Sequence, residues 1–149
     1  MTESRFQYVT YIKATPDAVW DALTSPEAMK IYFFGLPFEA ELKPGGSWRR
    51  LFPDGALMTE GEILEIEPPS QLVMSWRNAE AEKKAEGFSR CAMDLKAVDT
   101  ATRLTVTHSI GAADSKLIAA VAQAWPQVLS NLKTFLETGT VALAVPART

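Results

Sequence analysis

A single long amphipathic helix, predicted from about Asp114 to Thr138, closes the chain. Its apolar residues recur every three or four positions and form one continuous stripe. They are Leu117, Ile118, Val121, Ala122, Trp125, Val128, Leu129, Leu132, Phe135 and Leu136. The opposite, polar face carries Lys116, Gln123, Gln127, Asn131, Lys133 and Glu137. Because no second helix of this length precedes it, the stripe must be buried against a sheet.

The segment before this helix, residues 38–109, has a hydrophobic period of two. Short turns interrupt it at Lys43–Gly46, Pro53–Gly55, Pro68–Ser70 and Asp99–Thr100. Connections this short favour antiparallel pairing, so we predict about six strands in a meander. Residues 78–86 are polar, without an apolar face, and are predicted to be an irregular connection.

The first part of the chain adds one strand and two short helices. Phe6–Lys13 is rich in β-forming residues. Thr15 is a candidate N-cap followed by a proline, and Ser25 precedes a second short helix that runs to about Tyr32. The predicted fold class is therefore α+β: a curved antiparallel sheet of about six to seven strands wrapped around the C-terminal helix. We expect a single domain over residues 1–149, with a core at 6–138 and a tail at 139–149.

The composition excludes several classes of function. With a net charge of −3 the chain lacks the basic footprint of a nucleic-acid binder. No apolar run approaches the roughly 18 residues of a membrane span, and residues 1–10 lack a signal-peptide core, so a cytoplasmic location is the default. One cysteine excludes an internal disulfide and disfavours a cysteine-based metal site. Because no phosphate loop, dinucleotide fingerprint or metal-ligand cluster is present, we expect neither a metal nor a cofactor.

Five sequence pieces, in this order, resemble one known family: YVTYIKATPDAVWDALTSPE, PGGSW, EGEILEIEPPSQLVMSWR, TRLTVTHS and AWPQVLSNLKTFLE. The chain resembles the activator of heat shock protein 90 ATPase homologues, a branch of the START-related (SRPBCC, birch-pollen-allergen-like) helix-grip superfamily. The resemblance runs from about Tyr8 to Glu137. It implies a helix-grip fold, in which a curved sheet grips the C-terminal helix over a largely apolar cavity.

The resemblance leaves three functions open. Superfamily members bind lipids, sterols and aromatic compounds, which favours a small apolar or aromatic ligand between sheet and helix, with stress response as one setting. A few members are cyclases or other enzymes, so a cyclase- or hydrolase-type enzyme is an alternative. The family name comes from a co-chaperone, so a chaperone-binding partner protein is a third. Open strand edges and the apolar tail Val141–Val145 also make a homodimer a candidate state.

His108, the only histidine, is predicted to lie at the inner end of the last strand, on the side of Leu104 and Val106. It is a candidate catalytic base or ligand contact. The alternative is a structural histidine that bonds a backbone group where the strand turns toward the helix. No nucleophile or acid lies at a recognisable spacing from it, which disfavours a triad.

Glu60 and Glu62 are two further catalytic candidates, because residues i and i+2 of a strand point the same way. If that side faces the helix, the two carboxylates enter the cavity. If Gly61 marks a β-bulge, they face solvent, which we favour because burying unpaired carboxylates is costly. One inward arginine among Arg49, Arg50, Arg77 and Arg90 would be an anchor for a carboxylate.

The predicted ligand-binding wall combines inward strand residues with the helix stripe. It comprises Met74, Trp76, Cys91, Met93, Val106, His108, Val121, Trp125 and Leu129. A loop rich in aromatic rings is a candidate lid, or a partner surface, because loops rarely expose so many rings. Its residues are Tyr32, Phe33, Phe34 and Phe38.

Overall fold

The computed structural model describes residues 3–147 of the chain. Its elements, in chain order, are β1 (Ser4–Ile12), α1 (Pro16–Thr24), α2 (Pro26–Tyr32), β2 (Phe38–Ala40), β3 (Ser47–Leu51), β4 (Leu57–Glu67), β5 (Gln71–Asn78), α3 (Ala81–Lys84), β6 (Ser89–Val98), β7 (Ala101–Ile110) and α4 (Lys116–Thr138).

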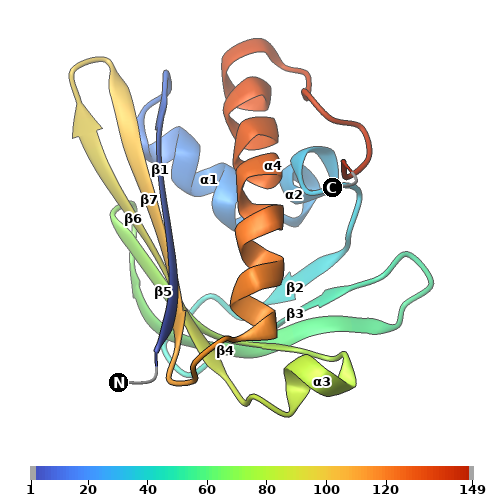
Figure 1. The fold of residues 1–149 in the computed structure, drawn as a ribbon. Coiled ribbons are helices and arrows are strands. Elements are labelled where there is room, and N and C mark those ends of the chain that lie inside the picture. The colour runs from blue at the N-terminus through green and yellow to red at the C-terminus, as the bar shows by residue number, and fades with distance from the viewer. Residues whose placement is uncertain (1–2, 148–149) are drawn as a thin grey trace.

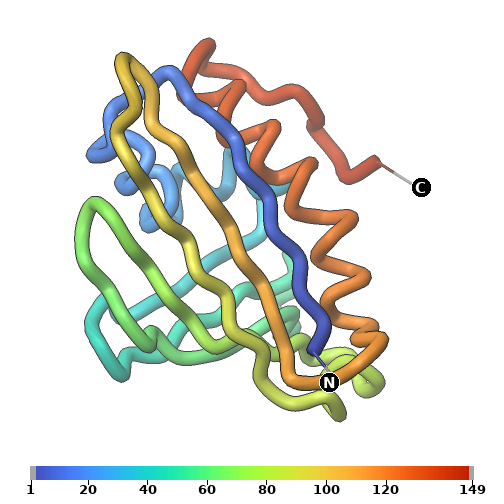
Figure 2. The backbone as a smooth tube through the Cα atoms, turned by 60° about the vertical axis from the view of Figure 1, so that its left-hand side comes forward, coloured from blue at the N-terminus to red at the C-terminus, as the bar shows by residue number. Residues whose placement is uncertain are grey.

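The strands form one seven-stranded antiparallel sheet in the order β1-β7-β6-β5-β4-β3-β2. Figure 1 shows the sheet curving around α4, with β1, β7 and β6 along one side of the helix and β4, β3 and β2 crossing beneath it. Figure 2, from the side, shows α4 lying along the concave face and α1 and α2 closing one end. The predicted α+β helix-grip fold is confirmed, and β2 is the strand that brings the number to seven.

The predicted helix ends are confirmed by their caps. Thr15 and Ser25 accept bonds from the amides of Ala18 and Ala28, each at 3.1 Å, and so satisfy free N–H groups of α1 and α2. Ser115 caps α4 in the same way, so α4 begins one residue after it rather than at Asp114. Gly139 ends α4 with φ of 85°, which glycine adopts without a Cβ clash.

The polar connection at residues 78–86 contains the short helix α3, which the sequence pattern did not predict. Glu86, just after α3, accepts bonds from the Ser115 hydroxyl at 2.6 Å and the Lys116 amide at 2.8 Å. The connection is therefore anchored to the start of α4, because a carboxylate suits the positive end of a helix dipole.

Asn131, predicted on the polar face of α4 opposite the apolar stripe, is not exposed, because the tail covers that part of the helix. Asn131 is fully buried, and its amide bonds both the carbonyl and the amide of Leu143, each at 2.8 Å. It also donates to the carbonyl of Tyr32 at 3.2 Å. One side chain thus fixes the tail to α4 and to the end of α2. The last two tail residues lie outside the described residues.

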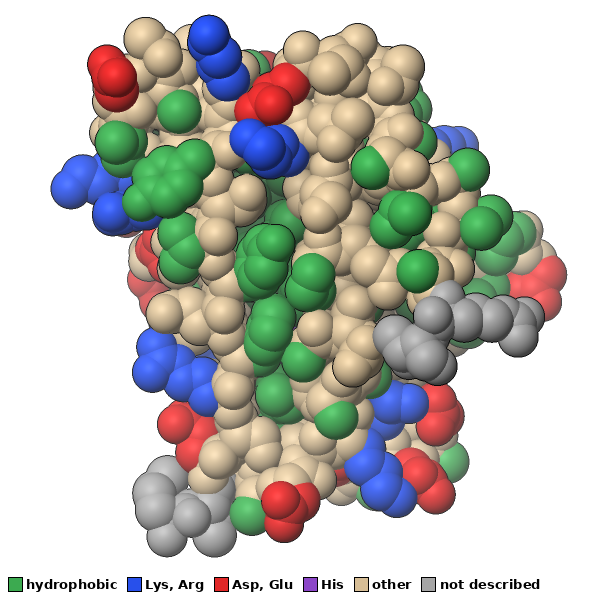
Figure 3. Space-filling view, turned by 45° about the horizontal axis from the view of Figure 1, so that its top comes forward, with side chains coloured by type: hydrophobic (Ala, Val, Ile, Leu, Met, Phe, Trp, Pro, Cys, Tyr) green, Lys and Arg blue, Asp and Glu red, His purple; other side chains and the backbone are tan. Residues whose placement is uncertain are grey.

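The concave face of the sheet and the inner face of α4 share one hydrophobic core. Phe6 and Tyr8 of β1 stack with ring centroids 6.3 Å apart at its edge. Figure 3 shows hydrophobic side chains gathered in a strip where β1 meets α4, with charged side chains toward the rim. Within residues 3–147, none of the helices combines the length and the apolar character that a membrane crossing requires.

Candidate functional site

Strand β3 decides which arginine faces the interior. Its burial alternates, so Trp48 and Arg50 are buried while Arg49 is exposed. Arg49 pairs with Glu39 on the outer face at 2.6 Å. Of the four arginines considered from the sequence, only Arg50 is buried, at 3% exposure.

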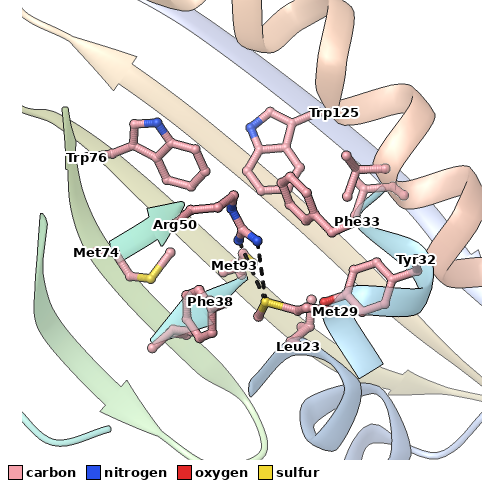
Figure 4. Close-up of a pocket in the computed structure, with 13 residues that line it drawn as sticks. Leu23, Met29, Tyr32, Phe33, Phe38, Arg50, Met74, Trp76, Met93 and Trp125 are labelled. Atoms are coloured by element: carbon pink, nitrogen blue, oxygen red, sulfur yellow. Dashed lines mark hydrogen bonds between the residues drawn. The ribbon is translucent and has the colours of Figure 1, made fainter. Parts of the chain in front are cut away.

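A small cavity lies between this strand, the sheet centre and α4 (Figure 4). Its volume is about 20 Å³, which is room for about one water molecule. Apart from Arg50, the described residues that line it are apolar or aromatic. The lining residues are Leu23, Met29, Tyr32, Phe33, Phe38, Arg50, Leu72, Met74, Trp76, Met93, Trp125, Val128 and Leu129.

The Arg50 guanidinium is enclosed by aromatic rings and one thioether. Its central carbon lies 3.6 Å from the ring centroid of Phe33 and 5.1 Å from that of Phe38. Its two terminal nitrogens approach the sulfur of Met29 at 3.7 Å and 3.6 Å. Burial lowers the pKa of Arg50 to about 10, so the group stays charged at neutral pH.

His108 belongs to a buried polar chain beside this cavity. Trp125 Nε1 donates to His108 Nδ1 at 3.2 Å, and His108 Nε2 lies 2.8 Å from the Ser89 hydroxyl. That hydroxyl donates to the carbonyl of Trp76 at 2.8 Å. Because the Ser89 hydroxyl donates its only proton to the Trp76 carbonyl, it must accept a hydrogen bond from His108. The neutral imidazole therefore carries its proton on Nε2.

Both ring nitrogens of His108 are therefore occupied in the neutral state. Burial lowers the pKa of His108 to about 4, because the loss of water around the ring disfavours its charged form. The expectation that a structural His108 would bond a backbone group is wrong in one detail, because its partners are the side chains of Ser89 and Trp125.

Glu60 and Glu62 lie on the outer face of β4, away from the cavity, while Thr59 and Ile63 point inward. Glu60 pairs with Arg77 at 2.8 Å, and Glu62 is exposed. Their outward orientation does not come from a bulge at Gly61, which was the alternative weighed from the sequence. The strand register instead shifts beyond it, between Ile63 and Glu65.

Gly61 has a different role, because the indole of Trp48 lies against it. Trp48 Nε1 reaches past it to the carbonyl of Ser75 on β5 at 2.9 Å, and the Ser75 hydroxyl accepts the amide of Glu62 at 2.9 Å. A Cβ on Gly61 would lie 2.6 Å from that indole nitrogen. Glycine therefore lets Trp48 cover the inner face of the sheet beside Trp76, at a centroid distance of 4.9 Å.

The predicted wall residues fall into two groups. Met74, Trp76, Met93, Trp125 and Leu129 line the cavity. The others are buried in the core behind or beside it, namely Cys91, Val106, His108 and Val121.

Arg50 is the lining residue whose role the sequence left undecided. A signal was present, because a tryptophan such as Trp48 is commonly buried, and Arg50 follows it by two positions on the same strand.

The predicted lid residues are divided between core and loop. Tyr32 and Phe38 are buried, and the Tyr32 hydroxyl donates to the carbonyl of Ala22 at 2.8 Å. Phe33 and Phe34 are half-buried in the loop, and Phe34 has φ of 56°, a left-handed conformation that is rare for an aromatic residue.

An apolar surface groove of about 380 Å³ lies outside Phe33. The loop after α2, the β3–β4 hairpin, α4 and the tail surround it, through residues that include Phe34, Phe52, Met58, Ala124 and Pro146. Phe33 and Val128 line both the groove and the cavity, so the two spaces are neighbours at these side chains.

Comparisons with known proteins agree with the fold. A family model described as "Activator of Hsp90 ATPase homolog 1-like protein" matches residues 13–137. No curated protein sequence matches the chain.

Among solved structures, CalU16 from Micromonospora echinospora superposes with a TM-score of 0.73 at 22% identity, over 94% of this chain and 78% of that one. PFC0360w, an HSP90 activator from Plasmodium falciparum, superposes with a TM-score of 0.72 at 20% identity, over 89% of this chain and 96% of that one. The Aha1 dimer from Colwellia psychrerythraea superposes with a TM-score of 0.72 at 20% identity, over 91% of this chain and 98% of that one. Likeness at these identities establishes the fold.

Proposed function

Because this chain belongs to the activator of Hsp90 ATPase homolog 1-like protein family, we propose that it binds a small, mainly apolar or aromatic molecule between its sheet and α4. One observation carries the proposal. The cavity and the apolar surface groove share Phe33 and Val128 as lining residues, so turning the half-buried Phe33 side chain aside would connect them. The ligand would enter through the groove and lie against Met74, Trp76, Met93, Trp125 and Leu129.

The ligand-bound state requires the interior to open. A cavity of about 20 Å³ is far below the roughly 300 Å³ of a typical ligand pocket, whereas the groove outside has about 380 Å³. Phe33 is the lid in this proposal. Met29, Met74 and Met93 are the walls that adapt, because methionine side chains repack easily around different shapes.

The test is a thermal-shift titration of the full chain, preceded by native mass spectrometry for a co-purified molecule. Naphthalenemethanol and decanol, with the matching acids naphthoate and decanoate, probe aromatic and lipid-like ligands. A binder present at about 100 times its Kd should raise the melting temperature by roughly 5 to 10 °C.

The substitution Met93→Trp fills the cavity and should abolish that rise, whereas Leu64→Trp, on the exposed side of β4, should leave it unchanged. If no probe shifts the melting temperature and no mass co-purifies, the proposal is wrong. It is also wrong if Met93→Trp, correctly folded, responds like the natural sequence.

A second candidate is a chaperone partner, supported by the family description and by the likeness to the HSP90 activator from Plasmodium falciparum. Binding through the surface should survive Met93→Trp. Loss of chaperone binding in a folded Met93→Trp variant would argue against a surface mode.

The dimer formed by the Colwellia psychrerythraea protein likewise makes a homodimer worth testing by analytical ultracentrifugation.

The cyclase- or hydrolase-type alternative gains no specific support. His108 has both ring nitrogens bonded, and Glu60 and Glu62 lie on the other face of the sheet.

A further inference from the structure

The cavity wall contains a buried cation without a counter-ion. Arg50 is 3% exposed, and within residues 3–147 no carboxylate lies at ion-pair distance from it. Its Nε–H has no hydrogen-bond partner there either. A guanidinium has five N–H donors, and these five are left with a single thioether. Buried charges in proteins are normally paired, so this one calls for an explanation.

The surrounding rings compensate the charge only in part. Phe33 and Phe38 offer their faces to the guanidinium, but a ring face accepts no in-plane N–H bond. Trp76, another lining residue, also buries its Nε1–H without a partner in the described part of the chain. Among the described residues, the cavity therefore has an unused N–H donor on Arg50 and no anion.

Met29 marks where an anion would lie. Its sulfur lies 3.7 Å and 3.6 Å from the two terminal nitrogens of Arg50, at the edge of the guanidinium where both nitrogens present N–H groups (Figure 4). A carboxylate binds a guanidinium at this edge through two parallel N–H···O bonds. Thioether sulfur is a weak acceptor on a flexible side chain, so Met29 can give way to a stronger acceptor.

The charge balance defines the class of ligand. Arg50 is the only charged residue that lines the cavity in the described part of the chain, and the other walls are almost entirely apolar or aromatic. One carboxylate would neutralise it, whereas a doubly charged phosphate would leave an uncompensated charge inside the protein. We infer that the ligand is an apolar monocarboxylate, an aromatic or a fatty acid, whose carboxylate binds the guanidinium of Arg50. This inference rests on the proposed binding function and specifies its ligand.

The test compares each acid with its neutral alcohol by isothermal titration calorimetry of the full chain. The pairs are naphthoate with naphthalenemethanol and decanoate with decanol, which separate aromatic from fatty acids. In the natural sequence we expect at least one acid to bind ten-fold or more tightly than its alcohol. Arg50→Met should abolish this preference while alcohol affinity stays within about three-fold, since the apolar walls remain.

Arg49→Met is the matched control, because it removes an arginine from the outer face of the same strand, and it should preserve the preference. If Arg50→Met does not fold, Arg50→Lys replaces it in the test. Lysine keeps the positive charge but lacks the planar guanidinium that binds a carboxylate through two N–H groups, so this variant should lose most of the preference for acids over alcohols. Alcohols that bind as tightly as acids, or an acid preference that survives the Arg50 substitutions, would overturn the inference alone. Failure of both acids and alcohols to bind would overturn the proposed function with it.

Discussion

The indole N–H of Trp125 donates to Nδ1 of His108 across 3.2 Å, and this bond fixes the protonation of the only imidazole in the chain. A proton on Nδ1 would oppose the indole donor, so the charged ring must break the bond. We therefore predict a neutral Nε2–H tautomer at pH 7. Nitrogen-15 NMR of the single histidine measures this directly, and a predominant Nδ1–H signal would contradict the assignment.

The burial of His108 predicts how the stability of the protein depends on pH. Burial lowers the pKa of His108 from 6.5 to about 4, so the unfolded chain binds the proton more readily between those values. Stability should therefore fall as pH drops from about 6.5 through 4, by at most about 3 kcal/mol. Chemical denaturation across this range, compared with His108→Gln, isolates the contribution. Identical pH profiles would mean that His108 titrates normally in the folded state.

The unpaired charge of Arg50 should cost stability in the ligand-free protein. Arg50→Met keeps much of the apolar stem and removes the buried charge, so the free energy of unfolding should rise by about 1 to 2 kcal/mol. Arg49→Met, which breaks an exposed ion pair, should change it by less than about 1 kcal/mol. A clear loss of stability in Arg50→Met during urea denaturation would indicate that the aromatic contacts of the guanidinium outweigh its desolvation.

Gly61 should tolerate no side chain. A Cβ there would lie 1.8 Å from the carbonyl oxygen of Ser75 and 2.6 Å from the indole nitrogen of Trp48. Gly61→Ala should therefore lower the free energy of unfolding by more than about 2 kcal/mol. Gly111→Ala meets no atom within 4 Å and should change it by less than about 0.5 kcal/mol. Equal effects in urea denaturation would show that the space at Gly61 is not required.

The tail should depend on Asn131. Asn131→Leu leaves the amide and carbonyl of Leu143 without their partners and should cost about 2 kcal/mol or more. Hydrogen exchange at the Leu143 amide should accelerate by about two- to ten-fold, since the lost hydrogen bond contributes about 0.5–1.5 kcal/mol to its protection. Gln127→Ala removes an exposed bond to the Ala147 amide and should affect neither global stability nor exchange at Leu143. Slow exchange in Asn131→Leu would mean that other contacts hold the tail.

Sequence patterns predicted the elements well because they follow from local chemistry. The caps at Thr15 and Ser25, the period of two in β7 and the apolar stripe of α4 depend on residues close in the chain. The inward position of His108 could be predicted for the same reason. Asn131 could not, because its burial depends on a tail that returns twelve residues later.

The candidate site could be predicted only in part. Wall residues such as Trp76 and Trp125 follow from strand and helix periodicity. The face of Arg50 remained undecided because both arginines of β3 are polar and the short strand offers few alternations. Its lack of a counter-ion within residues 3–147 could not be predicted at all, since it depends on which carboxylates the fold brings near. The carboxylates of Glu60 and Glu62 lie on the other face of the sheet.

Apart from the short helix α3, the sequence by itself determined the order of elements, the antiparallel sheet and the helix that it grips, because hydrophobic periodicity and caps act over a few residues. Only the tertiary structure decided that a buried arginine faces the cavity, that Phe33 lines both this cavity and the surface groove, and that the cavity is nearly filled. These features arise where β3, the loop after α2 and α4 meet. Their packing depends on side chains from distant parts of the chain, and no local pattern records such contacts.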